Sequence, residues 1–196
     1  TGDASVTEIS SLSVEVGKTG KWQYSPDNGT IRVLTADLPA GTEPTDDQLE
    51  TLDLPILATV GEGSTLTFRD SGEMTGSILV AGTAEKYAEE IEDDGGDVML
   101  AAMAALDDTA SEEAAEPEIV KSQVNGVVDG HWTGSLYGST GSVSKVEVAS
   151  GGVWENSYKL LNDTVNASGG AEITVIDNGT LRGTVSAYDS GSILDI

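Results

Sequence analysis

A long pattern that occurs twice without a gap sets the strongest constraint on the fold. The run "GSTLTFRDSGEMTGSI" begins at Gly63, and "GAEITVIDNGTLRGTV" begins at Gly170. Small and apolar residues and a turn aspartate coincide in the pairs Gly63/Gly170, Leu66/Ile173, Phe68/Val175, Asp70/Asp177, Gly72/Gly179, Met74/Leu181, Gly76/Gly183 and Ile78/Val185. Recurrence of this kind predicts a chain built from copies of one structural unit.

Shorter copies extend the pattern along the chain. The run "VDGHWTGSL" from residue 128 keeps the same frame, and "YDSGSIL" from residue 188 supplies another Asp-Ser-Gly turn. A second block, "VEVGKTGKW" from residue 14, matches "VEVASGGVW" from residue 146 and sets Trp22 opposite Trp154. In "GKWQYSPDNGTI", Gly20 and Gly29 have the spacing of Gly63 and Gly72, which predicts a further copy in that register.

Each unit reads as strand, turn, strand, because Gly and Asn accept turn conformations and the alternating Ile, Val, Leu and Phe suit a strand with one buried face. Two all-β architectures fit. In a right-handed parallel β-helix, or solenoid, each turn is a corner of a coil; in an antiparallel sandwich or meander, each Asp-Asn-Gly is a hairpin loop. A three-residue loop over 177–179 keeps Val175 opposite Leu181, so hairpins remain open. Recurrence of one unit with compact glycine turns favours the solenoid.

Two segments interrupt the units. A Pro-rich insertion spans residues 35–57, with a short turn of helix expected across 46–52 after the N-cap candidate Thr45. An acidic insertion of helix-forming composition spans residues 84–118, and its Met and Leu stripe is expected to pack on the β body. The chain therefore divides into a solenoid part at 1–83, the helical insertion at 84–118 and a second solenoid part at 119–196.

Charge and composition exclude several functions. Nine Lys and Arg against 34 Asp and Glu give a net charge of −25, which repels nucleic acid, so no nucleic-acid partner is expected. No apolar run approaches the roughly 20 residues of a membrane-spanning helix, so no membrane insertion of this segment is expected. The start lacks the features of a signal peptide, which suggests a piece excised from a longer protein. There is no Cys, so disulfides and thiolate metal sites are excluded.

Catalytic motifs are weak. The single histidine, His131, lies within a repeat-like run, which argues against a serine or cysteine triad. Arg32, Arg69 and Arg182 in turn units leave room for a polysaccharide lyase on a β-helix, but no carboxylate pair stands out for glycoside hydrolysis. We therefore expect a protein without catalytic residues and without a bound cofactor.

Calcium is the one cation to consider. Its candidate ligands are Glu92, Asp93, Asp94 and Asp97, which flank a Gly-Gly pair. Their order is not that of an EF-hand loop, and a solvated acidic helix end is favoured over a metal site.

Aromatic and asparagine residues have structural readings that compete with functional ones. Trp22, Trp132 and Trp154 would suit a sugar-stacking row, but they occupy repeat positions that also hold Met or Val, which favours core packing. Asn28, Asn162, Asn166 and Asn178 each begin an Asn-X-Ser/Thr triplet. Turn chemistry and chance explain these triplets without glycosylation.

Residues 165–196, "VNASGGAEITVIDNGTLRGTVSAYDSGSILDI", resemble the passenger repeats of bacterial autotransporter adhesins, in which Val-rich strands alternate with Gly-Gly or Asn-Gly corners. The resemblance implies a right-handed parallel β-helix on the outer face of a Gram-negative cell, acting in adhesion or self-association. The irregular repeat spacing, the acidic insertion and the lack of a signal peptide and membrane barrel depart from the family. The implied partners are a host or neighbouring cell surface, a glycan, or a second copy. A carbohydrate-active β-helix enzyme and a viral or filament subunit are the alternatives.

Overall fold

The computed structural model describes residues 2–7, 9–25, 30–34, 49–53, 55–86, 118–156, 163–189 and 191–196. Across these ranges the regular structure is entirely β, and none of the described residues forms a helix. Most strands belong to three parallel sheets, which we call A, B and C. The remaining strands form two antiparallel pairs.

The three sheets take their strands from the chain in strict rotation. Sheet A contains β1 (Ala4–Val6), β6 (Ile56–Val60), β9 (Ser77–Val80), β14 (Leu136–Gly138), β17 (Asp163–Ala167) and β20 (Thr184–Ala187). Sheet B contains β2 (Ser11–Val16), β7 (Thr65–Asp70), β12 (Gln123–Val128), β15 (Val143–Val148), β18 (Glu172–Asp177) and β21 (Ile193–Asp195). Sheet C contains β3 (Lys21–Gln23), β8 (Glu73–Thr75), β13 (His131–Thr133), β16 (Val153–Glu155) and β19 (Thr180–Arg182).

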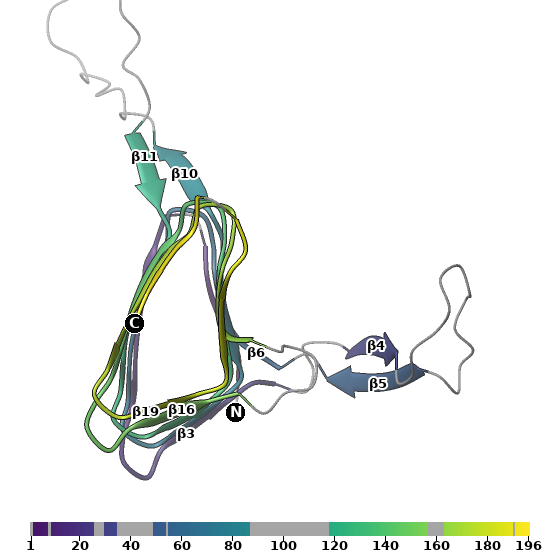
Figure 1. The fold of residues 1–196 in the computed structure, drawn as a ribbon, viewed down its shortest axis with the longest axis vertical. Helices are drawn as coiled ribbons and strands as arrows, with labels where there is room; N and C mark the ends of the chain where they lie inside the picture. Colours follow the sequence, from purple (N-terminus) through teal and green to yellow (C-terminus); the bar gives the residue numbers. More distant parts are fainter. Residues whose placement is uncertain are drawn as a thin grey trace, which may run out of the picture.

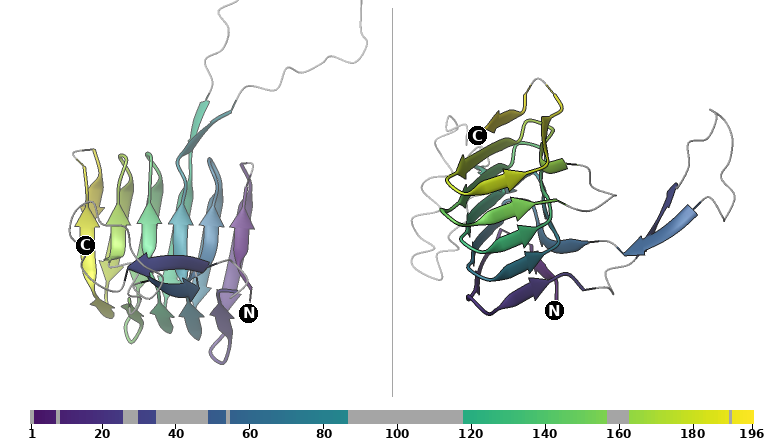
Figure 2. Two further views of the ribbon diagram at one scale, coloured as in Figure 1. Left: turned by 90° about the vertical axis from the view of Figure 1, so that its right-hand side faces the viewer. Right: turned by 60° about the horizontal axis from the view of Figure 1, so that its bottom comes forward.

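Seen along the stack, the chain follows a triangular path with one sheet on each side (Figure 1). We call one pass through sheets A, B and C a rung. Rung 1 is β1–β2–β3, rung 2 is β6–β7–β8, rung 3 is β9–β12–β13, rung 4 is β14–β15–β16, rung 5 is β17–β18–β19, and β20 and β21 begin a sixth. The rungs lie side by side in chain order (Figure 2). The protein therefore has a solenoid-like parallel β fold.

The antiparallel alternative is wrong for these three sheets. Strands that flank an Asp-X-Gly turn do not pair with each other; β18 pairs in parallel with β15, and β19 pairs in parallel with β16. The turn at Asn178 and Gly179 instead carries the chain from sheet B to sheet C. Each strand satisfies its backbone groups against the rungs before and after it, so the turn has no need to bring its own flanks together.

Strand registers confirm the repeat alignment. Leu66 lies beside Val124, Val124 beside Ser144 and Ser144 beside Ile173, so the predicted pair Leu66/Ile173 shares one column of sheet B. In sheet C a column contains Trp22, Met74, Trp132, Trp154 and Leu181, which confirms the pairs Trp22/Trp154 and Met74/Leu181.

The predicted copy that aligned Gly20 with Gly63 is wrong in its register. The amide of Glu73 donates to the carbonyl of Gly20 at 3.1 Å, and Lys21 pairs with Glu73. Gly20 therefore stacks on Gly72, nine residues away from the equivalence with Gly63 that the glycine spacing suggested. The spacing misled because glycines serve more than one corner of the rung.

Apolar side chains fill the interior of the stack. Phe68 is 2% exposed, and its ring occupies the space left by Gly126 in the next rung, where an added Cβ would lie 2.2 Å from Phe68 Cζ. Trp132 and Trp154 are fully buried and stack with ring centroids 4.3 Å apart, which confirms the core interpretation for these two residues. Their indole N–H groups donate to the carbonyls of Gly76 (2.8 Å) and Gly134 (3.0 Å). Trp22 is only partly buried, in rung 1.

Two antiparallel ribbons leave the stack at different corners (Figure 1). One pairs β4 (Thr30–Leu34) with β5 (Leu49–Asp53), and the other pairs β10 (Thr83–Lys86) with β11 (Glu118–Lys121). The helix expected across 46–52 is contradicted at 49–52, because this stretch belongs to β5. The segment is short, and pairing with β4 satisfies its backbone over five residue pairs, which a single helical turn would not do.

The acidic insertion is described only at its two ends. Residues 84–86 and 118 are strand, which contradicts a helix there, whereas the rest of the predicted helical insertion lies outside the described residues. The remainder of the 35–57 insertion also lies outside them, apart from β5, residue 55 and the start of β6.

Candidate functional site

The corner between sheets B and C varies in turn length from rung to rung. In rungs 2 and 3 two residues join the strands, as in Ser71-Gly72 between β7 and β8. In rungs 1 and 4 four residues join them, at 17–20 and 149–152. The longer turns are visible as loops below the strands of the first and fourth rungs in the left view of Figure 2. Two short turns therefore lie between two long ones.

This arrangement creates a polar recess of about 380 Å³, which we call the corner notch. Its lining comes from four rungs: Lys18, Thr19, Gly20, Lys21, Gly72, Glu73, Asp129, Gly130, His131, Gly151 and Val153. Because the strands of neighbouring rungs are about 4.8 Å apart, the two long turns stand roughly 14 Å apart along the stack. The notch is therefore a slot about as wide as one extended chain, bounded by a ridge on either side.

Glycine forms the floor of the notch because the rungs approach too closely for a side chain. An added Cβ at Gly72 would lie 2.4 Å from the carbonyl oxygens of Gly17 and Gly20, and one at Gly130 would lie 2.3 Å from the carbonyl oxygen of Gly72. The carbonyls cannot move aside, because they accept ladder bonds such as His131 N–H to Gly72 O at 2.9 Å. The floor is therefore bare backbone, and side chains are confined to the rim.

The rim carries charges of both signs. Lys21 Nζ lies 2.5 Å from Glu73 Oε2, and Arg69 pairs with Asp129, which also lies within 3.5 Å of the Ser71 hydroxyl. Lys18 is exposed and forms no ion pair with any described residue. Of the six Lys and Arg side chains that the structure describes, four lie at this corner or on sheet C: Lys18, Lys21, Arg69 and Arg182. Most of the described cations of this strongly acidic protein therefore lie in this region, where Glu73 and Asp129 balance Lys21 and Arg69 and leave Lys18 without an ion-pair partner.

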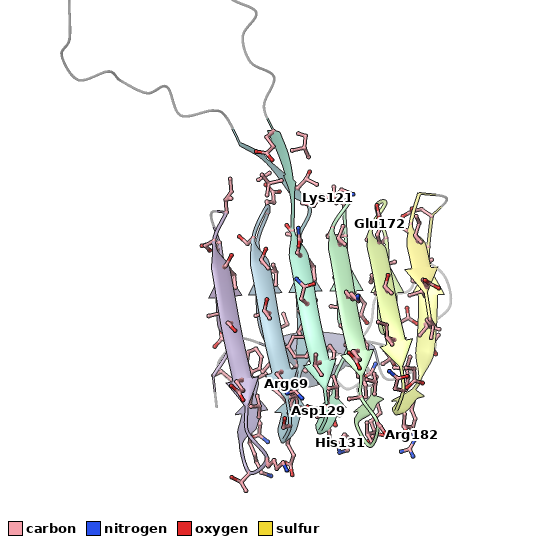
Figure 3. All side chains as sticks on the ribbon, turned by 90° about the vertical axis from the view of Figure 1, so that its left-hand side faces the viewer. Arg69, Lys121, Asp129, His131, Glu172 and Arg182 are labelled. Atoms are coloured by element: carbon pink, nitrogen blue, oxygen red, sulfur yellow. The ribbon has the colours of Figure 1, made fainter. Side chains whose placement is uncertain are left out.

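His131 connects the notch to an ion-pair ladder on the outer face of sheet C. Its Nε2 lies 2.9 Å from Glu155 Oε1, and Arg182 Nη1 donates to Glu155 Oε2 at 3.2 Å, so three successive strands are joined. Hydrogen bonds from His131 and then from Arg182 hold the pKa of Glu155 below its ordinary value. Figure 3 shows Arg69, Asp129, His131 and Arg182 at one end of the sheet B strands, with Lys121 and Glu172 at the other end.

Asp70 is a buried carboxylate at the end of β7, directly before the turn that contributes Gly72 to the notch. It has no exposed surface; its Oδ1 accepts from the Gly72 amide at 2.9 Å, and its Oδ2 has no hydrogen-bond partner in the described structure. Burial raises the pKa of Asp70, and the Gly72 hydrogen bond offsets only part of this effect. Val16, Val128 and Val148 hold the same column in rungs 1, 3 and 4, where they are buried, and Asp177 holds it in rung 5, where it is exposed. Asp70 therefore occupies a position that three other rungs fill with valine.

A second polar cluster lies on sheet A around Asp163, which is 6% exposed. Its carboxylate accepts from Tyr188 Oη at 2.8 Å, Asn166 Nδ2 at 3.0 Å and Ser186 Oγ at 3.2 Å. Three neutral donors satisfy the carboxylate, and the strand register shifts at this point between β17 and β20. The cluster therefore joins two rungs at a bulge, which gives Asp163 a structural role.

The predicted calcium ligands Glu92, Asp93, Asp94 and Asp97 lie outside the described residues. Within the described ranges, no three His, Cys, Asp or Glu side chains gather where a metal ion could be held.

The other residues that the sequence singled out are dispersed. Asn178 is exposed in a turn, Asn166 is bound to Asp163, and Asn28, Asn162 and the side chain of Arg32 lie outside the description. Lys18 and Lys21 of the corner notch were missed. The sequence did contain a signal for them. The turns in "VEVGKTGKW" and "VEVASGGVW" are each two residues longer than the turn in the Asp-Ser-Gly units.

The fold and site together define a class: a repetitive parallel β stack whose exposed corner bears a charged recess. Comparison with protein families, with curated proteins and with solved structures finds no match to this chain. Among the described residues, no helix is long and apolar enough to cross a bilayer.

Proposed function

We propose that this chain is a non-enzymatic extracellular surface module that acts in adhesion, and that it is part of a larger exported protein of a Gram-negative bacterium. The resemblance of residues 165–196 to autotransporter passenger repeats supports this assignment. So does the solenoid-like parallel architecture, whose described strands expose Ser, Thr, Asn and charged side chains along their outer faces.

The proposal includes the finer fold, a right-handed parallel β-helix. Connections between parallel strands of one sheet are right-handed in about 98% of cases, because a right-twisted strand and its crossover pack back on the sheet in only that way. Every consecutive pair of strands in sheets A, B and C is parallel and is linked through the other two sheets. A right-handed coil is the arrangement that follows from this rule.

The corner notch is the observation that carries the adhesive role. It places a rim of exposed charged side chains around a floor of glycine backbone, and one of them, Lys18, has no ion-pair partner among the described residues. A net charge of −25 opposes contact between copies of the chain, so we favour adhesion to another surface over self-association. The role requires no metal ion, and no cofactor is proposed.

Surface display tests the proposed function. The chain is displayed on a non-adherent bacterium, and the number of cells retained on epithelial monolayers is compared with that of cells displaying a variant with residues 17–20 replaced by Asp-Gly, the turn of rung 3. We expect display to increase retention and the variant to lose that increase while its display level stays the same. Equal retention with and without the chain would refute adhesion. Release of reducing ends from a panel of polysaccharides would refute the non-enzymatic assignment.

A further inference from the structure

We propose that the corner notch binds a short segment of an acidic oligosaccharide in which carboxylates are separated by neutral, hydroxyl-rich sugar units. This inference rests on the proposed function, because it names the ligand of the same surface. It is carried by three features of the notch: its shape, the absence of a free sheet edge at its floor and the distribution of charge along its rim.

The shape of the notch selects a single extended chain. Its two walls are the long turns of rungs 1 and 4, and the intervening rungs 2 and 3 contribute only glycine and the rim side chains. A ligand seated there would cross the corner from sheet B to sheet C, along the strand direction, with one ridge on each side. A globular partner would touch the ridges and leave the floor unfilled.

The backbone at the floor of the notch already forms hydrogen bonds between neighbouring rungs. Glu73 N–H donates to Gly20 O at 3.1 Å, His131 N–H to Gly72 O at 2.9 Å and Val153 N–H to Gly130 O at 2.8 Å. A peptide therefore cannot join the notch by adding a strand, since a strand needs a free sheet edge. The charged side chains of the rim are the groups on which we base recognition, and they suit sugar hydroxyl groups, which both donate and accept hydrogen bonds.

The charges on the rim favour a glycan with widely spaced carboxylates over a polyanion with closely spaced charges. Lys18 offers an ammonium group that no described carboxylate neutralises, and the Lys21–Glu73 and Arg69–Asp129 pairs present donors and acceptors together. A carboxylate on the ligand would meet Lys18 and Lys21, while sugar hydroxyls would donate to Glu73 and Asp129. A polysulfated chain or a nucleic acid would set repeated charge against these carboxylates and against the net charge of −25.

Isothermal titration with a hyaluronan hexasaccharide, which carries one carboxylate in every second sugar, provides the test. Chitohexaose serves as the neutral ligand and a heparin hexasaccharide as the dense polyanion. We expect hyaluronan to bind more tightly than either, with an affinity that falls as salt is added.

Two double variants with the same change of charge locate the site. In Lys18→Gln/Lys21→Gln the notch loses two cations, and affinity for hyaluronan is expected to fall about tenfold, the loss for two exposed charge contacts. In Lys121→Gln/Lys145→Gln the cations removed lie on β11 and the outer face of β15, and affinity is expected to stay within about twofold. Thermal unfolding confirms that both variants fold, since only exposed side chains change.

Each other outcome overturns the inference. If chitohexaose binds as tightly as hyaluronan, the ligand carboxylate has no role. If heparin binds more tightly than hyaluronan, the notch prefers a polyanion with closely spaced charges. If both double variants lose the same affinity, binding depends on the net charge of the protein and not on the notch. Failure of hyaluronan to bind, combined with retention of displayed cells that the residue 17–20 replacement abolishes, would leave adhesion through the notch intact and refute only the ligand. Loss of neither binding nor retention in the notch variants would refute both.

Discussion

Replacing Gly130 by Ala tests whether the close approach of rungs at the glycine corner determines which residues it accepts. The added Cβ would lie 2.3 Å from the carbonyl oxygen of Gly72, whereas ordinary van der Waals contact begins near 3.4 Å. Gly130 does not have a positive φ, so the cost comes from the overlap and not from backbone strain. Relief requires the turn of rung 3 to move about 1 Å away from rung 2.

Such a movement breaks the hydrogen bonds that fix this turn. Asp129 N–H and Gly130 N–H both donate to Asp70 O, at 2.7 and 2.9 Å, and His131 N–H donates to Gly72 O at 2.9 Å. Each bond contributes about 1 kcal/mol net, so losing two or three of them costs about 2–3 kcal/mol of the free energy of unfolding. This is a large part of the roughly 5–15 kcal/mol that holds a typical domain together.

Urea unfolding followed by circular dichroism measures this cost, with Gly17→Ala as the matched control at the same corner. An added Cβ at Gly17 meets no atom within 4 Å and its φ is not positive, so we expect a change within about 0.5 kcal/mol. Gly130→Ala should shift the midpoint to lower urea with an unchanged slope. If the two variants unfold at the same urea concentration, the reasoning about rung contact is refuted.

Three further predictions address the interior and the titrating groups. Gly126→Val should lower the free energy of unfolding by about 1–3 kcal/mol, because the valine side chain would enter the space of the Phe68 ring. Adding Phe68→Val should recover more than half of that loss, as measured by urea unfolding. Additive losses in the double variant would contradict this prediction. Burial raises the pKa of Asp70, so the stability that this carboxyl contributes is present below its ordinary value of 3.8 and is lost as pH rises through the raised pKa. Asp70→Asn should therefore unfold at higher urea than the parent at pH 7, with a difference that shrinks as pH falls; a constant difference would refute the assignment. The pKa of Glu155 is lowered, so its contribution is present above 4.5 and is lost as pH falls through the lowered pKa; a nuclear magnetic resonance titration should show this pKa rise in His131→Gln.

Side-chain alternation made the strands of sheet B predictable from the sequence. A slip of one residue would turn Leu66 and Phe68 outward and expose their apolar surface, so the pairs Leu66/Ile173 and Phe68/Val175 align from the amino-acid pattern alone. The same constraint extends to Trp132 and Trp154, whose repeat positions also hold apolar residues. Columns of buried residues are therefore recorded in the sequence wherever one face of the strand is buried.

Turn glycines were less informative than the strands. Gly20 and Gly72 stack because a carbonyl oxygen leaves no room for a Cβ, but Gly63 is a glycine because its φ is +67°. Close packing between rungs and a positive φ both require glycine, so the sequence does not distinguish them. Glycine spacing alone therefore gave the wrong register for Gly20. At β5 the composition was misleading, because a short polar run after a helix N-cap candidate indicates a preference for helix. The pairing of β5 with β4 cannot be predicted from such local composition.

Matching the two long turns to each other did not reveal the corner notch, because the notch also depends on the two short turns that lie between them in the stack. Strand registers must be kept from rung to rung, since every backbone bond depends on them, whereas a turn that projects into solvent can lengthen without disturbing the stack. Two extra residues in rungs 1 and 4, with none in rungs 2 and 3, are enough to raise two ridges around a floor of glycine. The binding surface of such a stack is therefore recorded in differences of turn length between repeats, and Lys18 lies in one of those extra positions.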